Sequence, residues 1–313
     1  MSRSAPPQDA TSVIMQEFFV DAPCPLSIDV PGAVTKIRPG ASDDRAEVEL
    51  SVAGCSASDA EQLFDRLDLD ARQVKGTIQV TSDLDRTTTE WWRWIRTFDG
   101  TLHVDVRCPS PVEADLTVPG GEIDMADLDG EFNLSVMGSP CHLVGLDGDI
   151  HLRGESSDVT LEDCSGTDIL ARVAVGSLTL TDVTAETLTL RSVAAPVSVT
   201  DCEGTTTITT RSAPVTVKGL EGPCTANSRG GPLHYEGCPT AETDLEVVGA
   251  PLTALLPPSC DAALTMTGPA LTLDEAFSFE GERADEKIAG VLNDGGTAFR
   301  LSGTGGTVEC QSA

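Results

Sequence analysis

The sequence predicts an all-β protein, a β-solenoid or single-stranded β-helix with rungs of 18–19 residues and one short helix in its N-terminal part. Three observations predict this fold. Apolar and polar residues alternate over short segments, one pattern recurs at a fixed interval between residues 121 and 240, and most repeats carry a Gly after an acidic or small polar residue. Hydrophobic residues make up 40% of the chain but aromatic residues only 4%, so the core must be mainly aliphatic.

The N-terminal residues 1–12 are expected to be a disordered tail. They contain no apolar segment with a small-residue cleavage site behind it, and no run of 18 apolar residues occurs anywhere in the chain. As it stands, the sequence predicts a cytoplasmic protein without a membrane span. If a leader has been removed, the cell surface is the alternative.

Residues 13–119 form a β-rich N-terminal region without the short period. Alternating strands are expected at 26–30, 48–52, 77–80 and 102–106. One helix is expected at about 58–67, because Ser58 and Glu61 have the spacing of a capping box. Leu63, Phe64 and Leu67 then follow at helical spacing.

The repeat begins near residue 120. One apolar column recurs in steps of 18 or 19 residues, and a second column follows each member by three residues. The first column is Met125, Leu143, Leu161, Leu180, Val199, Val217 and Tyr235, and the second is Leu128, Leu146, Cys164, Val183, Cys202, Leu220 and Cys238. Each unit holds two short strands that cannot bury their apolar face alone. Stacked units can, with equivalent residues about 4.8 Å apart. We therefore assign residues 120–313 to the solenoid and its C-terminal cap.

After residue 250 the solenoid is expected to continue less regularly. Strands are predicted at 271–273, 299–301 and 307–310. The segment 280–296 is predicted to be a solvent-exposed loop near the cap, which is needed because an open solenoid end exposes unpaired strand edges.

This pattern resembles the putative adhesin family of unknown function, whose domain is also called toastrack. The residues that carry the resemblance are Pro-Leu-Ser-Ile-Asp-Val-Pro-Gly at 25–32, the strand and Cys-Pro run at 103–109, the unit at 144–150 and the terminal Gly-Gly-Thr segment at 295–309. The resemblance covers about residues 14–310. It implies a β-helix or stacked-hairpin fold and a role at the cell surface or in the envelope, and it supplies no catalytic residues.

The charge balance excludes one class of partner. The chain has 20 Lys and Arg against 50 Asp and Glu, a formal net charge of −30, and only four of its basic residues are Lys. A duplex-binding protein needs a basic face, so we expect no nucleic-acid partner. Many acids with few Lys also fit a halophilic protein, and an acidic protein from a GC-rich genome is the alternative.

The ten cysteines show no CxxC or CxxH spacing. Cys164, Cys202 and Cys238 share one column but lie two rungs, or about 9.6 Å, apart. That exceeds the roughly 7 Å that a disulfide allows, so we expect these cysteines to be buried thiols. A pair stays open among those outside the clean repeat, namely Cys24, Cys55, Cys108, Cys260 and Cys310.

No catalytic or metal motif is present in the sequence. His142 and His234 fall on outward positions four or more rungs apart, too far to share a metal, and neither a phosphate loop nor a nucleophile elbow occurs. We therefore expect no cofactor, no metal and no enzymatic activity. The sequence favours a non-enzymatic scaffold or binding module with an unknown protein or glycan partner. The alternatives are a carbohydrate-active β-helix enzyme and a structural protein that self-associates through solenoid ends or edges.

One segment departs from the composition of the rest. It holds all three tryptophans of the chain beside two arginines. Aromatic side chains and Arg are favoured at binding hot spots, whereas burial of the aromatics against the solenoid end is the alternative. The candidate binding residues are Trp91, Trp92, Arg93, Trp94 and Arg96.

Overall fold

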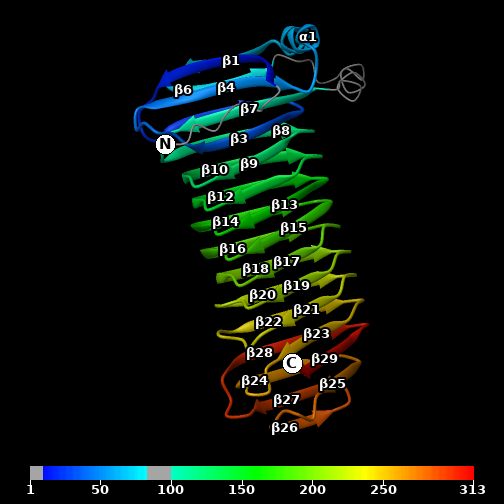
Figure 1. Cartoon of the computed structure of the whole chain (residues 1–313). Coiled ribbons are helices and arrows are strands. Elements are labelled where there is room, and N and C mark those ends of the chain that lie inside the picture. The colour runs from blue at the N-terminus through cyan, green and yellow to red at the C-terminus, as the bar shows by residue number, and fades with distance from the viewer. Residues whose placement is uncertain (1–9, 83–99) are drawn as a thin grey trace. The chain divides into compact units, whose positions relative to one another are not determined.

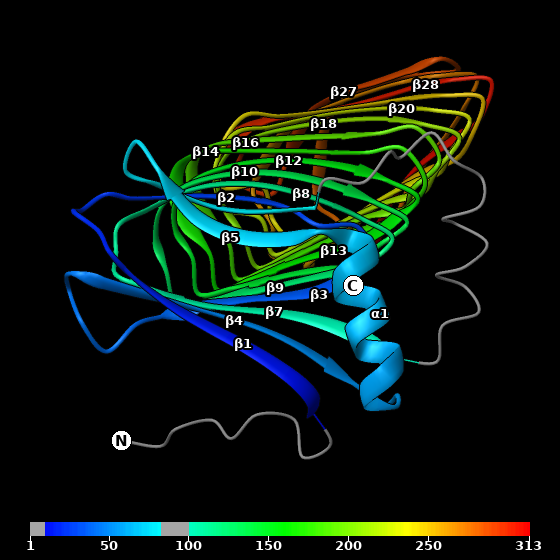
Figure 2. The same cartoon turned by 90° about the horizontal axis from the view of Figure 1, so that it is seen from above.

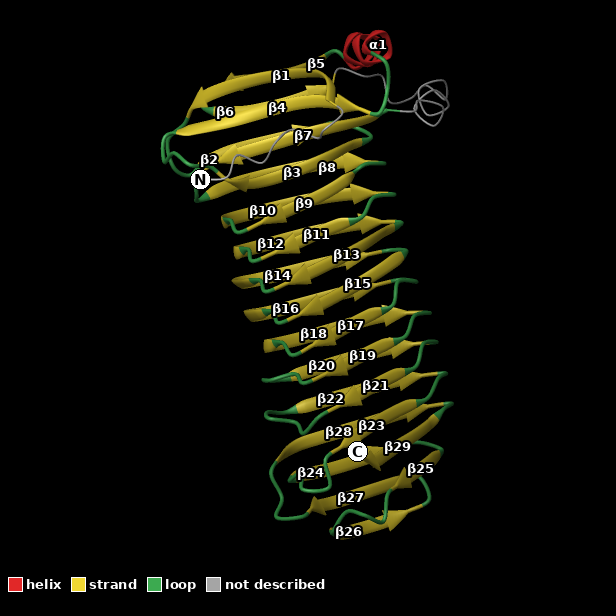
Figure 3. Cartoon of the chain, in the orientation of Figure 1, coloured by secondary structure: helices red, strands yellow, loops and turns green. Residues whose placement is uncertain are grey.

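The structure is a computed structural model that describes residues 10–82 and 100–313. The chain divides into two compact units, Met1–Leu152 (unit 1) and Arg153–Ala313 (unit 2). Strands dominate both units, and α1 is the one helix among the described residues (Figure 3). The predicted all-β solenoid is confirmed.

Unit 1 contains two sets of hydrogen-bonded strands. One set has the order β1–β4–β7–β3–β9–β11 and the other has the order β5–β6–β2–β8–β10. Strand β12 (Asp147–Glu155) spans the boundary between the units. The bounds are β1 Ala10–Phe19, β2 Cys24–Asp29, β3 Ala33–Pro39, β4 Arg45–Ala53, β5 Leu69–Val74, β6 Thr77–Ser82, β7 Thr101–Cys108, β8 Val112–Pro119, β9 Glu122–Ala126, β10 Asp129–Met137 and β11 Cys141–Val144.

Parallel stacking in unit 1 begins before the visible sequence repeat. Strand β2 pairs in parallel with β8, and β8 with β10, while β3 pairs in parallel with both β7 and β9. The edges are antiparallel, with β1 against β4, β4 against β7, and β5 against β6. The four strands predicted in residues 13–119 are confirmed as β2, β4, β6 and β7, whereas β1, β3, β5 and β8 lie outside the predicted ranges.

The predicted helix is present as α1 (Ala57–Leu67), but its N-cap differs from the one predicted. The hydroxyl of Ser56, not of Ser58, accepts a hydrogen bond from the Asp59 backbone N–H at 3.2 Å. The Ser56 hydroxyl in turn donates to the Asp59 carboxylate at 2.6 Å. An Asp three residues after the cap thus takes the place usually held by Glu in a capping box. The helix buries Leu63 and Leu67 and lies beside β1 (Figure 2).

Unit 2 continues the same architecture. One set of strands has the order β13–β15–β17–β19–β21–β23–β29–β25, and the other has the order β14–β16–β18–β20–β22–β28–β24–β27–β26 (Figure 1). The bounds are β13 Ser157–Glu162, β14 Ser165–Val173, β15 Gly176–Thr181, β16 Thr184–Ser192, β17 Val197–Thr200, β18 Glu203–Arg211, β19 Val215–Lys218, β20 Cys224–Arg229, β21 Leu233–Glu236, β22 Thr243–Val248, β23 Leu252–Leu256, β24 Ala262–Thr267, β25 Ala270–Leu273, β26 Phe279–Ala284, β27 Lys287–Leu292, β28 Thr297–Thr304 and β29 Thr307–Ser312.

The register of unit 2 confirms the predicted columns. Leu161 pairs with Leu180, which pairs with Val199, and the ladder continues through Val217 to Tyr235. All five side chains are buried. Equivalent residues of successive rungs therefore stack in one column, as the 18–19-residue period requires.

One corner of each rung requires a left-handed backbone. Asp163, Asp182 and Asp201 have φ values of 52°, 53° and 51°, and Gly219 and Gly237 take the same place in the next two rungs. Asp tolerates this conformation better than most residues with a β-carbon. The chain therefore uses either Asp or Gly at this corner, in step with the repeat.

The core is largely aliphatic, as predicted, but it also contains a buried hydroxyl row that we did not predict. Ser192 pairs with Thr210 across strands, and Thr210 pairs with Ser228. Each hydroxyl donates to a backbone carbonyl three residues further on, as Ser228 does to Gly231 at 2.7 Å. The hydroxyls thus satisfy carbonyls at a tight corner where no strand partner is available.

The prediction of a solvent loop at 280–296 is wrong. Strands β26 and β27 form an antiparallel hairpin there, and β27 pairs with β24. The segment resembles a loop in sequence because every residue from 280 to 287 is exposed and six of these eight are charged. The hairpin covers the last parallel strands of unit 2, which is the capping role expected for this end.

Candidate binding surface

The predicted binding segment, Trp91, Trp92, Arg93, Trp94 and Arg96, lies outside the described residues. Its role as a contact site therefore stays a prediction.

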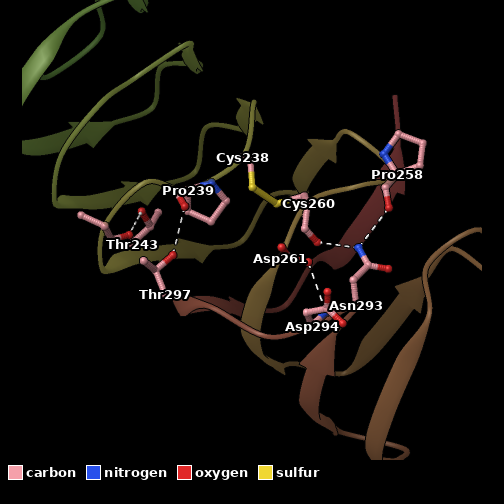
Figure 4. The surroundings of a disulfide bond; sticks show 10 residues. Cys238, Pro239, Thr243, Pro258, Cys260, Asp261, Asn293, Asp294 and Thr297 are labelled. Atoms are coloured by element: carbon pink, nitrogen blue, oxygen red, sulfur yellow. Dashed lines mark hydrogen bonds between the residues drawn. A yellow bond between two sulfur atoms is a disulfide. The ribbon is translucent and has the colours of Figure 1, made fainter.

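The expectation that Cys238 is a free thiol is wrong, because Cys238 forms a disulfide with Cys260 (Figure 4). The Cα atoms are 5.5 Å apart. The spacing between rungs keeps apart only cysteines of the same column. Cys260 lies outside that column, in the loop before β24. That loop is further fixed by Asn293, whose side-chain amide donates to the carbonyls of Pro258 at 3.0 Å and Cys260 at 2.8 Å.

The other eight cysteines form no disulfide. Burial raises the pKa of both Cys224 and Cys310 to about 12, so these thiols stay protonated at neutral pH. Cys24 and Cys108 are both fully buried and share a side-chain hydrogen bond, which lowers the pKa of Cys24 and raises that of Cys108. Apart from the disulfide, the cysteines of the repeat are small buried side chains, as predicted.

The histidines do not come together. His142 and His151 are exposed, and burial lowers the pKa of His103. Within residues 10–82 and 100–313, no group of three or more His, Cys, Asp or Glu side chains could hold a metal ion.

A column of arginines is the most distinctive surface feature of unit 2. Residues 153–313 contain seven arginines, and five of them occur at steps of 19, 19, 20 and 18 residues. Each lies in the second strand of its rung, on β12, β14, β16, β18 and β20 in turn. The five are Arg153, Arg172, Arg191, Arg211 and Arg229.

Four of these residues form what we call the arginine face: Arg172, Arg191, Arg211 and Arg229. Arg172 lies directly opposite Arg191 on the neighbouring strand, and Arg211 lies directly opposite Arg229. Thr209 pairs with Arg191, so the second pair is displaced by two residues along the strands. All four side chains are exposed, because their neighbours along each strand point into the core.

None of these four guanidinium groups has a hydrogen bond or ion pair with another described residue. The flanking arginines do have partners, since Arg153 contacts Glu155 at 2.9 Å and Arg300 pairs with Glu242. Like charges directly opposite each other on neighbouring strands are unfavourable. The arginine face is thus uncompensated positive charge in a protein whose net charge is −30.

Polar, uncharged residues lie between and beside the arginines. Thr189, Thr207 and Thr225 form one paired row across β16, β18 and β20, and Asn227 pairs with Thr209 in the next row. Acidic residues border the face, with Asp168 on β14 and Glu246 opposite Asn227 on β22. The face therefore combines guanidinium, hydroxyl and amide donors within an acidic border.

Sequence reasoning missed the arginine face although its signal was present. The five arginines recur at nearly the period of the apolar columns, with one step of 20 residues between Arg191 and Arg211. They stand near the ends of their strands, outside the apolar columns on which the predicted repeat rests.

A second surface feature lies on β1, at the edge of its sheet in unit 1. Met15 is 62% exposed and Phe19 is 68% exposed, although both are large apolar residues. Arg45 lies over the Phe19 ring at 4.9 Å. An exposed apolar edge strand is suited to pairing with another strand.

Among the described residues, no helix has the length and apolar character needed to span a membrane.

Comparisons with known proteins give no family assignment. No family model matches the chain, and neither does any curated protein. The resemblance to the putative adhesin family therefore stays a prediction.

Three solved structures align along almost the whole chain. A putative cell adhesion protein from Clostridium sporogenes shares 8% identity over 96% of this chain and 100% of its own, with a TM-score of 0.25. A putative lipid binding protein from Parabacteroides distasonis shares 10% identity over 95% and 96%, with a TM-score of 0.46. A putative adhesin from Bacteroides fragilis shares 11% identity over 96% and 97%, with a TM-score of 0.36. At these values the alignments carry no argument about function.

Proposed function

We propose that this protein is a non-enzymatic β-solenoid binding module that holds an extended partner of repetitive structure. One observation carries the proposal. On the outer face of β14, β16, β18 and β20, side chains of the same type stack in register from rung to rung, as in the pairs Arg172–Arg191 and Arg211–Arg229. A surface that repeats about every 4.8 Å offers equivalent contacts to each unit of a polymer.

A length series tests this function. Immobilised protein is exposed to oligomers of graded length from several polysaccharides, and affinity is measured by biolayer interferometry. Because each added unit finds another rung, we expect affinity for the bound polymer to rise with length until the face is filled. Length-independent binding, or no binding to any repetitive polymer, contradicts the proposal.

The absence of catalysis is a separate part of the proposal. A carbohydrate-active enzyme would cleave its polymer into shorter chains, whereas a binding module releases the polymer intact. After prolonged incubation, we expect no new reducing ends and an unchanged polymer size distribution. The release of shorter products would instead favour the alternative of a β-helix enzyme.

We further propose that the protein works outside the cytoplasm, as an adhesin-like or envelope-associated module. The Cys238–Cys260 disulfide supports this location over the cytoplasmic one expected from the N-terminal sequence. Disulfides persist in oxidising compartments and are rare in the cytosol. Non-reducing peptide mass spectrometry on protein isolated from its native cells is the test, and a fully reduced pair would contradict an extracytoplasmic location.

The segment Trp91–Arg96 is proposed as a second contact with the partner. Large aromatics bring contact area at low entropy cost, and Arg brings planar donors. We expect Trp92→Ala to melt like the wild type and to bind its partner more weakly. A loss of roughly 3–5 kcal/mol of stability would instead indicate a buried tryptophan and defeat this contact.

A further inference from the structure

We propose that the arginine face binds an acidic polysaccharide laid across the strands, with sugar carboxylates on Arg172, Arg191, Arg211 and Arg229. The inference rests on the proposed function and names the class of its ligand. Its starting point is the set of four exposed guanidinium groups on four successive strands of one sheet.

Charge is the first argument. The face places two pairs of like charges directly opposite each other, and none of the four groups is neutralised by another described side chain. A bound anion would relieve this repulsion. Arginine is the residue best suited to the task, because its planar fork can hold a carboxylate through two parallel hydrogen bonds.

Spacing is the second argument. One guanidinium is available on each of four consecutive rungs, and rungs are about 4.8 Å apart. A chain of 1,4-linked sugar acids repeats its carboxylate at intervals of a similar size. The displacement of Arg211 by two residues relative to Arg191 gives the column a lateral step, so the polymer would cross the strands obliquely.

The residues around the arginines favour a glycan over other polyanions. Thr189, Thr207 and Thr225 form a row of hydroxyls beside the charged column, and Asn227 adds an amide. These groups can both donate to and accept from sugar hydroxyls. The acidic border at Asp168 and Glu246, together with the net charge of −30, opposes the long-range attraction of any polyanion, so binding would depend on these short-range contacts at the face.

The test compares two polymers with the same sugar backbone, one with charged carboxylates and one with neutral methyl esters. Isothermal titration calorimetry measures binding of an oligogalacturonate long enough to span four rungs and of its methyl ester. We expect the acid to bind at least about tenfold more tightly than the ester. The fourfold variant Arg172→Gln, Arg191→Gln, Arg211→Gln, Arg229→Gln is expected to bind the acid no better than the ester.

The control is Arg283→Gln, the same type of substitution at one exposed arginine of β26, away from the arginine face. It is expected to bind the acid like the wild type. Because the four arginines are exposed and make no hydrogen bond or ion pair with another described residue, the fourfold variant is expected to melt like the control. Circular dichroism checks this.

Three results would overturn the ligand class. In the first, acid and ester bind equally and the fourfold variant keeps this binding. The protein then binds repetitive polymers without recognising their charge, which leaves the proposed function standing. Equally tight binding of a single-stranded oligonucleotide of the same charge shows a general polyanion site. If the wild type binds neither galacturonan, the inference fails, and the length series on other polymers decides the proposed function by itself.

Discussion

At the scale of single residues, two buried threonines differ in whether their hydroxyl groups are hydrogen-bonded. Thr35 on β3 is fully buried and its hydroxyl has no hydrogen-bond partner among the described residues, whereas the Thr210 hydroxyl lies 3.1 Å from that of Ser228. A buried hydroxyl without a partner costs about 1–3 kcal/mol, and an apolar group of the same shape avoids that cost.

We therefore expect Thr35→Val to raise the free energy of unfolding by about 1 kcal/mol and Thr210→Val to lower it by a similar amount. Urea denaturation of both variants measures the two changes. If Thr35→Val destabilises as much as Thr210→Val, the hydroxyl of Thr35 has a partner and the structural description of that site is wrong.

The disulfide gives a second prediction at this scale. It joins residues 22 apart, and closing a loop of that size stabilises a fold by about 3 kcal/mol. The double variant Cys238→Ser, Cys260→Ser should lose about that much, while the control Cys55→Ser, which removes a half-buried thiol outside the disulfide, should lose less. Thiol titration in denaturant without reductant should find eight reactive groups. A count of ten would show that the bond does not form.

At the scale of elements, stacking fixes which residue can stand at a rung corner. Gly148 has φ = +147°, and a β-carbon there would lie 1.8 Å from the carbonyl oxygen of Gly130 in the preceding rung. Gly138 also has a positive φ, of +64°, but a β-carbon there would meet nothing within 4 Å. Only the first glycine is required by contact between rungs.

We expect Gly138→Ala to cost about 1–2 kcal/mol, the penalty of a left-handed backbone alone. Gly148→Ala should cost clearly more, because its β-carbon must push two rungs apart. Thermal denaturation of both variants compares the costs. Equal destabilisation would indicate that the rungs do not stack as closely as described.

At the scale of elements, the sequence alone predicts the repeated strands but not the irregular parts of the fold. Columns such as Leu180 and Val199 repeat visibly because each must fill the same place in successive rungs. The hairpin of β26 and β27 was not predicted, because an end cap does not repeat and so leaves no periodic pattern in the sequence. Its first strand also carries charges on both exposed faces, which hides the alternation typical of a strand. The Cys238–Cys260 pair escaped for a related reason, since it joins a repeat position to an irregular loop. The arginine face follows the period except for the step of 20 residues between Arg191 and Arg211, so its recurrence is visible in the sequence.

At the scale of the whole chain, the net charge of −30 predicts a dependence of stability on salt. Repulsion among surface carboxylates destabilises the folded state, and salt screens it over about 10 Å at 0.1 M. We expect the melting temperature to rise between low and molar NaCl. An unchanged melting temperature would show that the acidic surface costs the fold little, and would remove the support for a halophilic adaptation.

The central claim is that the arginine face binds a repetitive acidic polymer one rung at a time. The most direct test removes its arginines cumulatively, from Arg172→Gln alone to all four, and measures the dissociation constant of one oligogalacturonate by calorimetry. Because each rung contributes an equivalent contact, the account predicts that affinity falls by a similar factor at every step. Loss of all binding with a single substitution, or no loss with four, would contradict it.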